Sequence, residues 1–273
     1  MRPFLGKSAF FGQSWRRSGA RVFYNTRMNA PRFFCPLPLV EGAALDLPED
    51  AARHAGRVLR LRVGDALILF DGKGGEVDAV IDAVTRDRVS VRLGARRLVE
   101  RESPLTITLV QALQTGDKMD ATIQKAVELG VSRIVPVVSR RSVLRLDGER
   151  ALRRAAHWRG VAVAACEQCG RNRVPEIEDI IALERWLAQP VPGGRRLMLA
   201  PEADAVLLTL APPAPGQAIE LLIGAEGGLA PEETALATGA GFCGVRLGPR
   251  VLRTETAGMA ALAAIQAVWG DFA

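Results

Sequence analysis

The sequence lacks any apolar run long enough to cross a bilayer, which takes about 20 residues. Its longest candidate, Val161 to Cys166, is far shorter. The hydrophobic share of 48% and the charged share of 24% are typical of a globular protein. The sequence therefore argues against a membrane protein, and its 273 residues suffice for about two domains.

The chain also has few residues of the kinds that bind metals. Cys166 and Cys169 form a Cys-x-x-Cys pair, but no second pair completes a zinc site. A thioredoxin-like motif would follow a strand, whereas this pair ends a helical stretch. We therefore expect reduced thiols, no bound metal and a cytoplasmic protein. His54 and His157, the only histidines, lie outside the glycine-rich loops described below.

Acidic residues are missing from residues 1–31, which hold six basic ones and show no helical or strand period. We predict a disordered N-terminal extension. It is either an organellar targeting segment or, as we favour, the product of a start codon placed ahead of Met28. Without these six, the chain has 36 − 6 = 30 basic residues against 30 acidic ones. RNA binding would therefore need a local basic patch.

Residues 32–102 have the pattern of a small β-barrel domain. Alternating apolar runs at 66–70, 76–81 and 88–93 predict strands, with a turn at 71–75. One helix is predicted from Pro48 to Leu61. Ser103-Pro104 is the expected boundary with a second domain, residues 103–273.

The second domain alternates strands with helices, which predicts an α/β fold with a mostly parallel sheet covered on both faces. The predicted strands are 105–113, 132–138, 197–199, 219–223 and 244–247. The predicted helices are 117–129, 148–168, 231–240 and 254–268. Asp117 and Thr254 are expected to cap the first and last of these helices.

Two glycine-containing loops each follow a strand and precede a helix. The first is Gly224-Ala-Glu-Gly-Gly228, and the second runs from Gly248 to Arg253. Ligands of open α/β sheets bind at the carboxyl ends of strands. Neither loop has the P-loop or the Gly-x-Gly-x-x-Gly pattern, so ATP and NAD lack support. Taken singly, each loop could also be a tight turn without a ligand.

Together with the residues around them, the loops resemble the RsmE family of the SPOUT superfamily. The first, Ile223-Gly-Ala-Glu-Gly-Gly228, and Leu247-Gly-Pro-Arg-Val-Leu-Arg-Thr-Glu-Thr-Ala257 match its signature pair. Further matches extend over residues 32–273, among them His54-x-x-Arg-Val-Leu-Arg60 and Gly116-Asp-Lys-Met-Asp120. The resemblance implies a SAM-dependent methyltransferase that acts on N3 of a specific uridine in 16S ribosomal RNA. It also implies a C-terminal trefoil knot, a PUA-like RNA-binding barrel and a homodimer.

The resemblance also assigns site residues. SAM is expected to contact mainly the backbone of the two loops and their neighbours, namely Leu199, Leu222, Gly224, Glu226, Gly227, Gly228, Leu247, Gly248, Val251, Leu252, Thr256 and Ala257. Arg253 is the candidate for stabilising the uracil anion, and Glu226 or Glu255 is a candidate base. The expected RNA contacts are Arg32, His54, Arg57, Arg60, Lys118, Arg140, Arg141 and Arg171.

Basic surface supports an RNA partner. Residues 133–173 contain ten arginines and three acids, which favours phosphate contacts over a merely solvated helix face. Phe33 and Phe34 could stack on bases or pack in the core.

Two positions depart from the family pattern. Ala225 replaces the usual proline, which would loosen the first loop, and Thr115 replaces the usual lysine. These departures keep open an alternative function, an RNA-binding module with a degenerate, non-catalytic SAM site.

Overall fold

The computed structural model describes residues 30–144, 146–189 and 193–272. The predicted disordered extension therefore lies almost entirely outside the described residues. Within them, no helix is long and apolar enough to cross a membrane.

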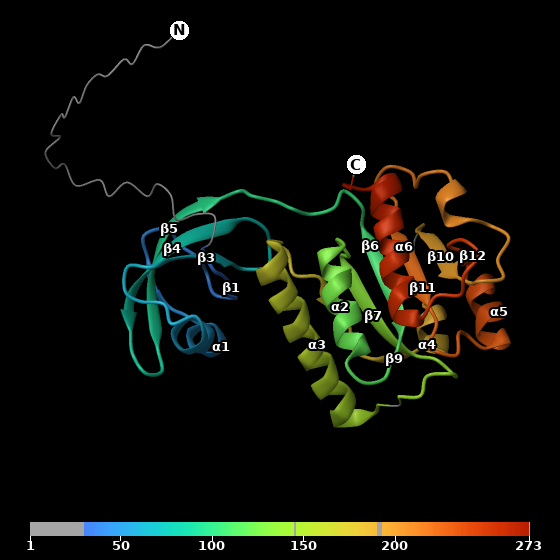
Figure 1. Ribbon diagram of the computed structural model, residues 1–273, viewed down its shortest axis with the longest axis horizontal. Helices are drawn as coiled ribbons and strands as arrows, with labels where there is room; N and C mark the ends of the chain where they lie inside the picture. The colour runs from blue at the N-terminus through green and yellow to red at the C-terminus, as the bar shows by residue number, and fades with distance from the viewer. Residues whose placement is uncertain (1–29, 145, 190–192, 273) are drawn as a thin grey trace, which may run out of the picture. The chain divides into compact units, whose positions relative to one another are not determined.

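The first sheet of the described chain is a five-stranded, mainly antiparallel one (Figure 1). Its order is β1-β3-β4-β5-β2. The strands are β1 Arg32–Phe34, β2 Ala44–Asp46, β3 Ala66–Phe70, β4 Glu76–Val84 and β5 Val89–Arg97. The three longer strands confirm the alternation in the sequence, and most of their buried apolar side chains form one cluster, whereas Phe70 packs in the core of the second sheet. Strands β1 and β2, with three residues each, show no readable alternation and were not predicted.

The helix expected from Pro48 to Leu61 is present but changes character along its length. Helix α1 spans Glu49–Arg53 and continues as a π-helix, η2, over His54–Val58. Arg60, just beyond it, has φ 55° and is the non-glycine residue with positive φ in the described chain. π-Helical turns and such strained residues gather at functional sites. Apolar periodicity cannot report either feature.

The second sheet is parallel throughout, with the order β12-β10-β11-β6-β7-β8 in the described chain and β9 also paired with β7. Its strands are β6 Ile107–Ala112, β7 Arg133–Val138, β8 Glu176–Ile177, β9 Ile181–Ala182, β10 Arg195–Leu199, β11 Ile219–Ile223 and β12 Cys243–Val245. The predicted α/β class is thus confirmed. Strands β8 and β9 have two residues each and carry no readable pattern.

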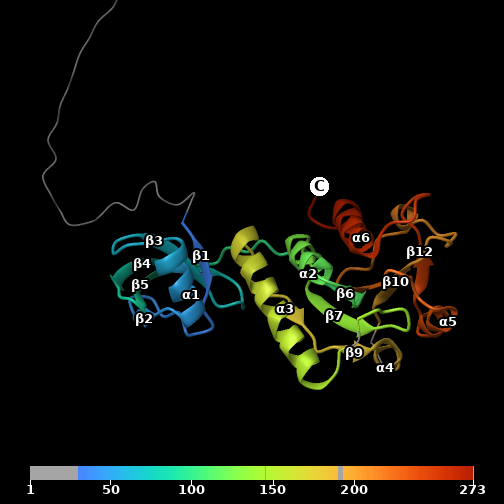
Figure 2. The same cartoon turned by 60° about the horizontal axis from the view of Figure 1, so that its bottom comes forward.

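Helices cover both faces of this sheet, as Figures 1 and 2 show. Successive strand residues point to opposite faces, so Leu221 and Leu222 of β11 enter different apolar clusters. One cluster includes residues of α2 Lys118–Glu128, α3 Gly148–Cys169 and α6 Thr254–Trp269. The other includes residues of α4 Leu183–Leu187 and α5 Pro231–Gly239. Helix α4, with five residues, was not predicted.

The last helix lies among segments that are distant in sequence. Helix α6 contacts α2 and β11, and it also contacts the short 3-10 helix η3, Leu207–Thr209. Strand β12 lies at the edge of the sheet, yet α6, which follows it, packs over the central β11. The chain therefore returns toward the centre of the sheet after β12, through the second glycine loop.

Buried charges connect the first sheet to the segment after α3. Glu76 of β4 is 1% exposed and forms ion pairs with Arg32, Arg97 and Arg101. Arg32 also donates a 2.7 Å hydrogen bond to Asn172. Burial, the largest influence, raises the pKa of Glu76, but the hydrogen bond from Arg32 and the three positive charges outweigh it and lower that pKa.

This arrangement predicts the effect of Glu76→Gln. Removing one partner from a buried ion pair typically costs about 3–5 kcal/mol, so the free energy of unfolding at neutral pH should fall by roughly that amount. Because the folded-state pKa is lowered, the stabilisation is complete above the ordinary value of 4.5 and is lost as the pH falls through the folded-state pKa. The difference between variant and wild type should therefore narrow on acidification.

Urea unfolding at a series of pH values measures this difference. Glu149→Gln is the control, because Glu149 forms an exposed pair with Arg153 and should contribute under about 1 kcal/mol. Equal, small effects of both substitutions would show that the Glu76 cluster does not stabilise the fold.

Candidate active site

The two glycine loops meet at the carboxyl edge of the parallel sheet. Thr254 is 6% exposed, and its hydroxyl donates a 2.6 Å hydrogen bond to the carbonyl of Gly224. The hydroxyl oxygen of Thr254 also accepts a 3.1 Å hydrogen bond from the side-chain amide of Gln111, near the end of β6. One hydroxyl thus connects the first loop, the start of α6 and a central strand.

The predicted capping roles need correction. Arg253, not Thr254, is the N-cap of α6, and Thr254 is its first helical residue. Its hydroxyl is directed to another loop instead of to its own helix. Asp117 does occupy the N-cap of α2, but its side chain makes no capping hydrogen bond.

The first loop is closed by its own backbone. The amide of Gly228 donates to the carbonyl of Ala225 at 2.8 Å, and Gly228 has φ 73°. A Cβ on Gly224 would lie 2.9 Å from the carbonyl carbon of Gly228, so a side chain there would break the turn. Gly224 is therefore needed for the turn itself. With Ala225 in place of the usual proline, the turn is still closed by this hydrogen bond.

The second loop leaves room beside it. Gly248 has φ 72°, and nothing lies within 4 Å of the position a Cβ would take. Leu247 and Leu252 are half-buried against the core, whereas Val251 is 77% exposed. The loop therefore presents open backbone next to apolar side chains, which suits a ligand that is recognised by main-chain groups.

Glu226 is held as a carboxylate. Its side chain is 28% exposed. Partial burial, the largest influence, raises its pKa, but hydrogen bonds from its own amide and from the amide and hydroxyl of Thr115, together with the charge of Lys118, lower that pKa overall. The Thr115 bonds measure 3.3 and 3.2 Å. A lowered pKa makes a carboxylate a weak proton acceptor, which argues against Glu226 as the base.

Lys118 lies between the two loops. Its ammonium is 3.6 Å from Glu226 of the first loop and 3.7 Å from Glu255 of α6. Lys118 was expected to contact RNA, but here it neutralises two carboxylates of the site. Thr115, which stands where the family usually has lysine, donates hydrogen bonds to Glu226 from its amide and its hydroxyl.

A third segment, residues 139–143, borders the first loop. The guanidinium of Arg141 donates to the carbonyl of Gly227 at 2.7 Å. Glu233 is fully buried and accepts from the amides of Arg140 and Ala230 at 2.7 and 2.8 Å. Sequence reasoning did not single out Glu233. The available signal was a glutamate at the third position of a helix that begins with Pro231.

The structure brings most of the expected cofactor-binding residues to one edge of the sheet. They end strands β10 to β12 or lie in the loops and the first turn of α6. Leu222 is an exception, because its side chain is completely buried in the core and can offer a ligand only its backbone. Ala257 is 9% exposed. The expected catalytic Arg253 is exposed, with no side-chain partner recorded among the described residues.

The expected RNA contacts divide into two groups. His54, Arg57, Arg60, Arg140 and Arg141 are exposed, although Arg140 pairs with Glu184 and Glu232. Arg171 was wrongly assigned to RNA, since it is 5% exposed, pairs with Glu102 and donates to two buried carbonyls. Arg32 likewise has its guanidinium engaged by Glu76 and Asn172.

Phe33 and the cysteines, which the sequence left open as candidates for base stacking or metal binding, have the surroundings of ordinary structural residues. Phe33 is in the core of the first sheet. The four cysteines are free thiols, and burial raises the pKa of Cys166 to about 12. Among the described residues no cluster of His, Cys, Asp and Glu could hold a metal ion.

Comparison with known proteins identifies the family. Residues 101–266 match the family described as RNA methyltransferase domain, and residues 47–94 match RNA methyltransferase PUA domain. Ribosomal RNA small subunit methyltransferase E of Mycobacterium tuberculosis is 33% identical over 82% of this chain and 86% of its own. The chain belongs to the RsmE family. The barrel is accordingly a PUA-like domain, and the parallel-sheet domain has the SPOUT fold.

Solved structures of similar proteins agree with this family assignment. Ribosomal RNA small subunit methyltransferase E from Neisseria gonorrhoeae, bound to S-adenosyl methionine, is 42% identical with a TM-score of 0.85, over 90% of this chain and all of that one. A Legionella pneumophila protein described as a putative methyltransferase, in complex with SAM, is 37% identical with the same TM-score, over 89% of this chain and all of that one.

The hydrogen bonds of the Thr254 hydroxyl to Gly224 and Gln111 give a prediction. Thr254→Val keeps the shape but leaves the Gly224 carbonyl with no hydroxyl donor and the Gln111 amide short of an acceptor. Unsatisfied buried groups cost about 1–3 kcal/mol, so the free energy of unfolding should fall by that range and SAM affinity should fall with it. Urea unfolding and calorimetric titration with SAM measure the two effects. Thr254→Ser keeps the hydroxyl and is the control. Normal SAM affinity in the valine variant would show that the Thr254 hydrogen bonds do not contribute to the SAM site.

Proposed function

We propose that this protein methylates N3 of a specific uridine in the 16S RNA of the small ribosomal subunit, with SAM as methyl donor. It is an RNA methyltransferase by family. The observation that carries the proposal is the pair of glycine loops, joined through Thr254 at the carboxyl edge of the parallel sheet. A protein of the same fold, 42% identical, carries SAM and is named as a methyltransferase of small-subunit ribosomal RNA.

The residues present fit SAM. The space beside Gly248 and the half-buried Leu247 and Leu252 provide apolar surface and open backbone for an adenine ring. Leu199 and Gly224, at the ends of two neighbouring strands, and the exposed Gly227 and Gly228 border the same edge. Val251, Thr256 and Ala257 complete the set that we propose to hold the cofactor. The carboxylate of Glu226 suits a positively charged part of SAM.

The chemistry asks for charge stabilisation and alignment. SAM, when bound, supplies a methyl group already activated on a sulfonium. Uracil N3 carries a proton and becomes nucleophilic only when a base takes that proton, a role that we propose for the carboxylate of Glu255. The negative charge then spreads to O2 and O4. The N3 electron pair then forms the new bond to the methyl carbon, and the sulfur keeps the pair of the bond that breaks. We propose that Arg253, which is exposed at the N-terminus of α6, binds the uracil oxygens and stabilises this charge.

The alternative of a degenerate, non-catalytic site is weakened by the geometry. Both departures from the family pattern have a structural account, because Ala225 takes part in a closed turn and Thr115 binds Glu226. Neither residue obstructs the open edge of the loops.

Several further properties belong to the proposal. We propose a homodimer, a trefoil knot, no metal requirement, a cytoplasmic location, and a division into a barrel of residues 32–102 and a methyltransferase domain of residues 103–273. The contacts of α6 with β11 and with η3 support the knot, because the last helix packs against the central strand and against the segment that precedes it in the chain.

The test of the function is direct. Small ribosomal subunits that lack the modification are incubated with the protein and methyl-labelled SAM, with and without a chelator, and the RNA is digested to nucleosides. We expect label in 3-methyluridine, equally in both reactions. Binding of SAM and of RNA without any labelled nucleoside would instead support the non-catalytic alternative.

Replacement of Arg253 tests its role. Losing one preorganised charge-stabilising donor typically costs about 10²–10³ in rate, so Arg253→Ala should reduce turnover by that factor while SAM affinity and melting temperature stay near wild type. Arg253→Lys should recover only part, because lysine cannot bind two oxygens in one fork. Single-turnover methylation and calorimetry separate the effects. If SAM binding, stability and turnover fell together, Arg253 would be a structural brace.

A further inference from the structure

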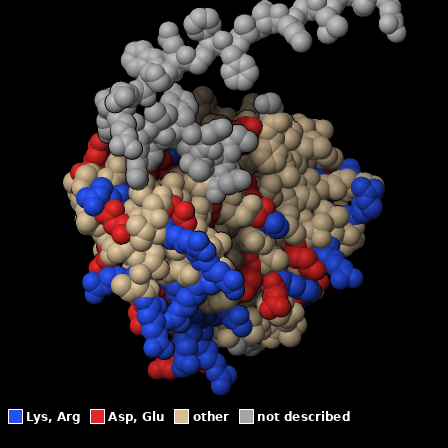
Figure 3. Space-filling view, turned by 60° about the vertical axis from the view of Figure 1, so that its left-hand side comes forward, with Lys and Arg blue, Asp and Glu red and all other residues tan. Residues whose placement is uncertain are grey.

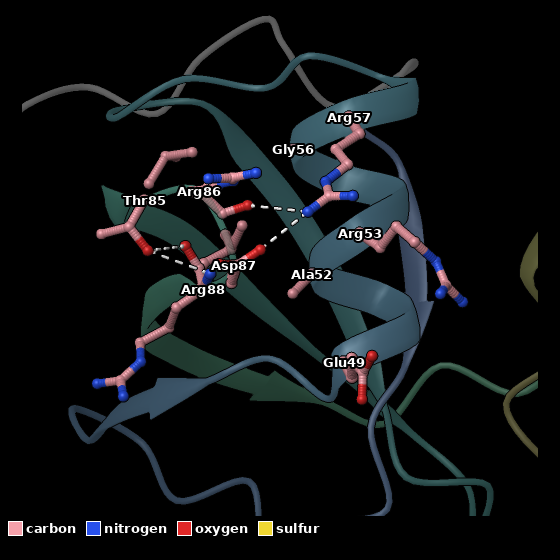
Figure 4. Close-up of a pocket in the computed structure, with 11 residues that line it drawn as sticks. Glu49, Ala52, Arg53, Gly56, Arg57, Thr85, Arg86, Asp87 and Arg88 are labelled. Carbon is pink, nitrogen blue, oxygen red and sulfur yellow. Dashed lines mark hydrogen bonds and ion pairs between the residues drawn. The ribbon is translucent and has the colours of Figure 1, made fainter.

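Basic side chains gather on one face of the molecule, as Figure 3 shows. Several of the exposed arginines are neutralised by the chain itself. A cavity of about 660 Å³ between the α1–η2 helix and the β4–β5 turn is an example (Figure 4), because three arginines that line it form ion pairs with aspartates. The pairs are Arg53 with Asp50, Arg57 with Asp87 and Arg88 with Asp46.

The guanidinium of Arg141 is bound differently, by the backbone of the first glycine loop. It donates a 2.7 Å hydrogen bond to the carbonyl of Gly227. The side chain is exposed, and no carboxylate pairs with it in the described part of the chain. Its aliphatic part also covers the loop, since a Cβ on Gly227 would lie 3.4 Å from the Cδ and 3.5 Å from the Cβ of Arg141. Both parts of the side chain therefore contact the loop.

This hydrogen bond holds one end of a single peptide unit. The carbonyl of Gly227 and the amide of Gly228 belong to the same planar peptide and point in opposite directions. The amide donates to the carbonyl of Ala225 at 2.8 Å, so the peptide is held at both ends. Because glycines flank this peptide on both sides, it can rotate at little steric cost once either hydrogen bond is lost.

The backbone that carries Arg141 is fixed by a closed turn. Residues 139–142, here called the β7 turn, follow strand β7 and begin and end with buried serines. The amide of Ser139 donates to the hydroxyl of Ser142, and the amide of Ser142 donates to the carbonyl of Ser139, both at 3.1 Å. Arg141 thus projects from a rigid base.

A buried carboxylate joins the β7 turn to the far end of the loop. Glu233 is fully buried, and one of its oxygens accepts from the amide of Arg140 at 2.7 Å. The other oxygen accepts from the amide of Ala230 at 2.8 Å. The first loop is therefore held at its start by Thr254, at its end by Glu233 and in its middle by Arg141. Of these three, the attachment in the middle is the exposed one.

We propose that Arg141 is a positioning residue of the SAM site, which holds the peptide between Gly227 and Gly228 in the orientation that the cofactor requires. The proposal rests on the proposed function for the identity of the ligand. It assigns Arg141 to the cofactor loop, whereas the family resemblance assigns this arginine to RNA. Loss of the Arg141 bond leaves the buried attachments at Thr254 and Glu233 in place, so SAM affinity should change without a change in stability.

The main test is calorimetric titration of the full chain with SAM. Arg141→Met keeps an aliphatic chain above Gly227 but has no donor. SAM should bind about tenfold more weakly, because only molecules with a correctly oriented peptide bind and the fraction of such molecules falls. The melting temperature should stay near wild type. Arg141→Lys should recover part of the affinity, because an ammonium can donate to the same carbonyl.

Methylation kinetics give a second readout. In Arg141→Met the KM for SAM should rise by the same factor of about ten, whereas turnover at saturating SAM should stay near wild type, since an occupied loop is already in its bound form.

A second substitution tests the peptide itself. The backbone of Gly227 lies outside the left-handed region, so an alanine is accommodated there. Alanine also restricts the rotation that glycine allows. Gly227→Ala should therefore restore part of the SAM affinity when it is combined with Arg141→Met. If this double variant fails to fold, the lysine variant and the exchange experiment below decide.

Hydrogen exchange examines the loop without any cofactor. Peptides that cover residues 222–230 should exchange faster in Arg141→Met than in wild type, because the Gly228 amide opens more often. Arg185→Met is the control, since it removes an exposed arginine of α4 and the same charge. It should change neither exchange nor SAM affinity. Glu233→Gln shows what a structural defect looks like, because it should lower the melting temperature and SAM affinity together.

Each outcome has one meaning. Wild-type SAM affinity in Arg141→Met would overturn the proposal, and so would a raised KM for RNA with unchanged SAM affinity and exchange, which would make Arg141 an RNA contact. A joint fall of stability and SAM affinity, as in Glu233→Gln, would also overturn it. A protein whose SAM affinity depends on Arg141 but which methylates no ribosomal RNA would refute the proposed function and leave the positioning role standing.

Discussion

The hydrogen bond from Thr254 to the carbonyl of Gly224 is the constraint on which the site depends. The two glycine loops leave different strands, and their carbonyl and amide groups would point into solvent independently without a link. Thr254 supplies that link from the first turn of α6 and is itself held by Gln111 of β6. Lys118 adds an electrostatic link, because its ammonium lies 3.6 Å from Glu226 of the first loop and 3.7 Å from Glu255 of α6. Residues that hold the loops together thus come from α6, β6 and α2.

Glycine has two distinct uses in these loops. Gly224 is required because a Cβ would collide with the backbone of Gly228, so its role is internal to the turn. Gly248 has positive φ but open space around it, so its backbone stays accessible. The sequence pattern presents both as equivalent glycines, and only the contacts of each position tell them apart. Accessible backbone at the second loop and a closed turn at the first form complementary walls of one site.

The arginines divide in the same way by their surroundings. Arg32 and Arg171 are buried partners of Glu76 and Glu102, and they fix the barrel and the segment after α3 to their neighbours. Arg57 and Arg86 instead border an open cavity and pair only weakly or not at all. A basic residue in a motif matched to an RNA-binding family is therefore no evidence of RNA contact until its burial and partners are known.

The sequence by itself determined the class of both sheets, the positions of the longer strands and helices, and the two loops, because alternation and helical spacing are local consequences of which face is buried. Motif order was specific enough to indicate the family. The tertiary structure alone decided that Thr254 connects two loops, that Glu226 is a stabilised carboxylate, that Arg171 is buried and that a cavity lies between a π-helix and the β4–β5 turn. Each of these depends on residues far apart in the chain, and distances across the fold are not encoded in any local pattern.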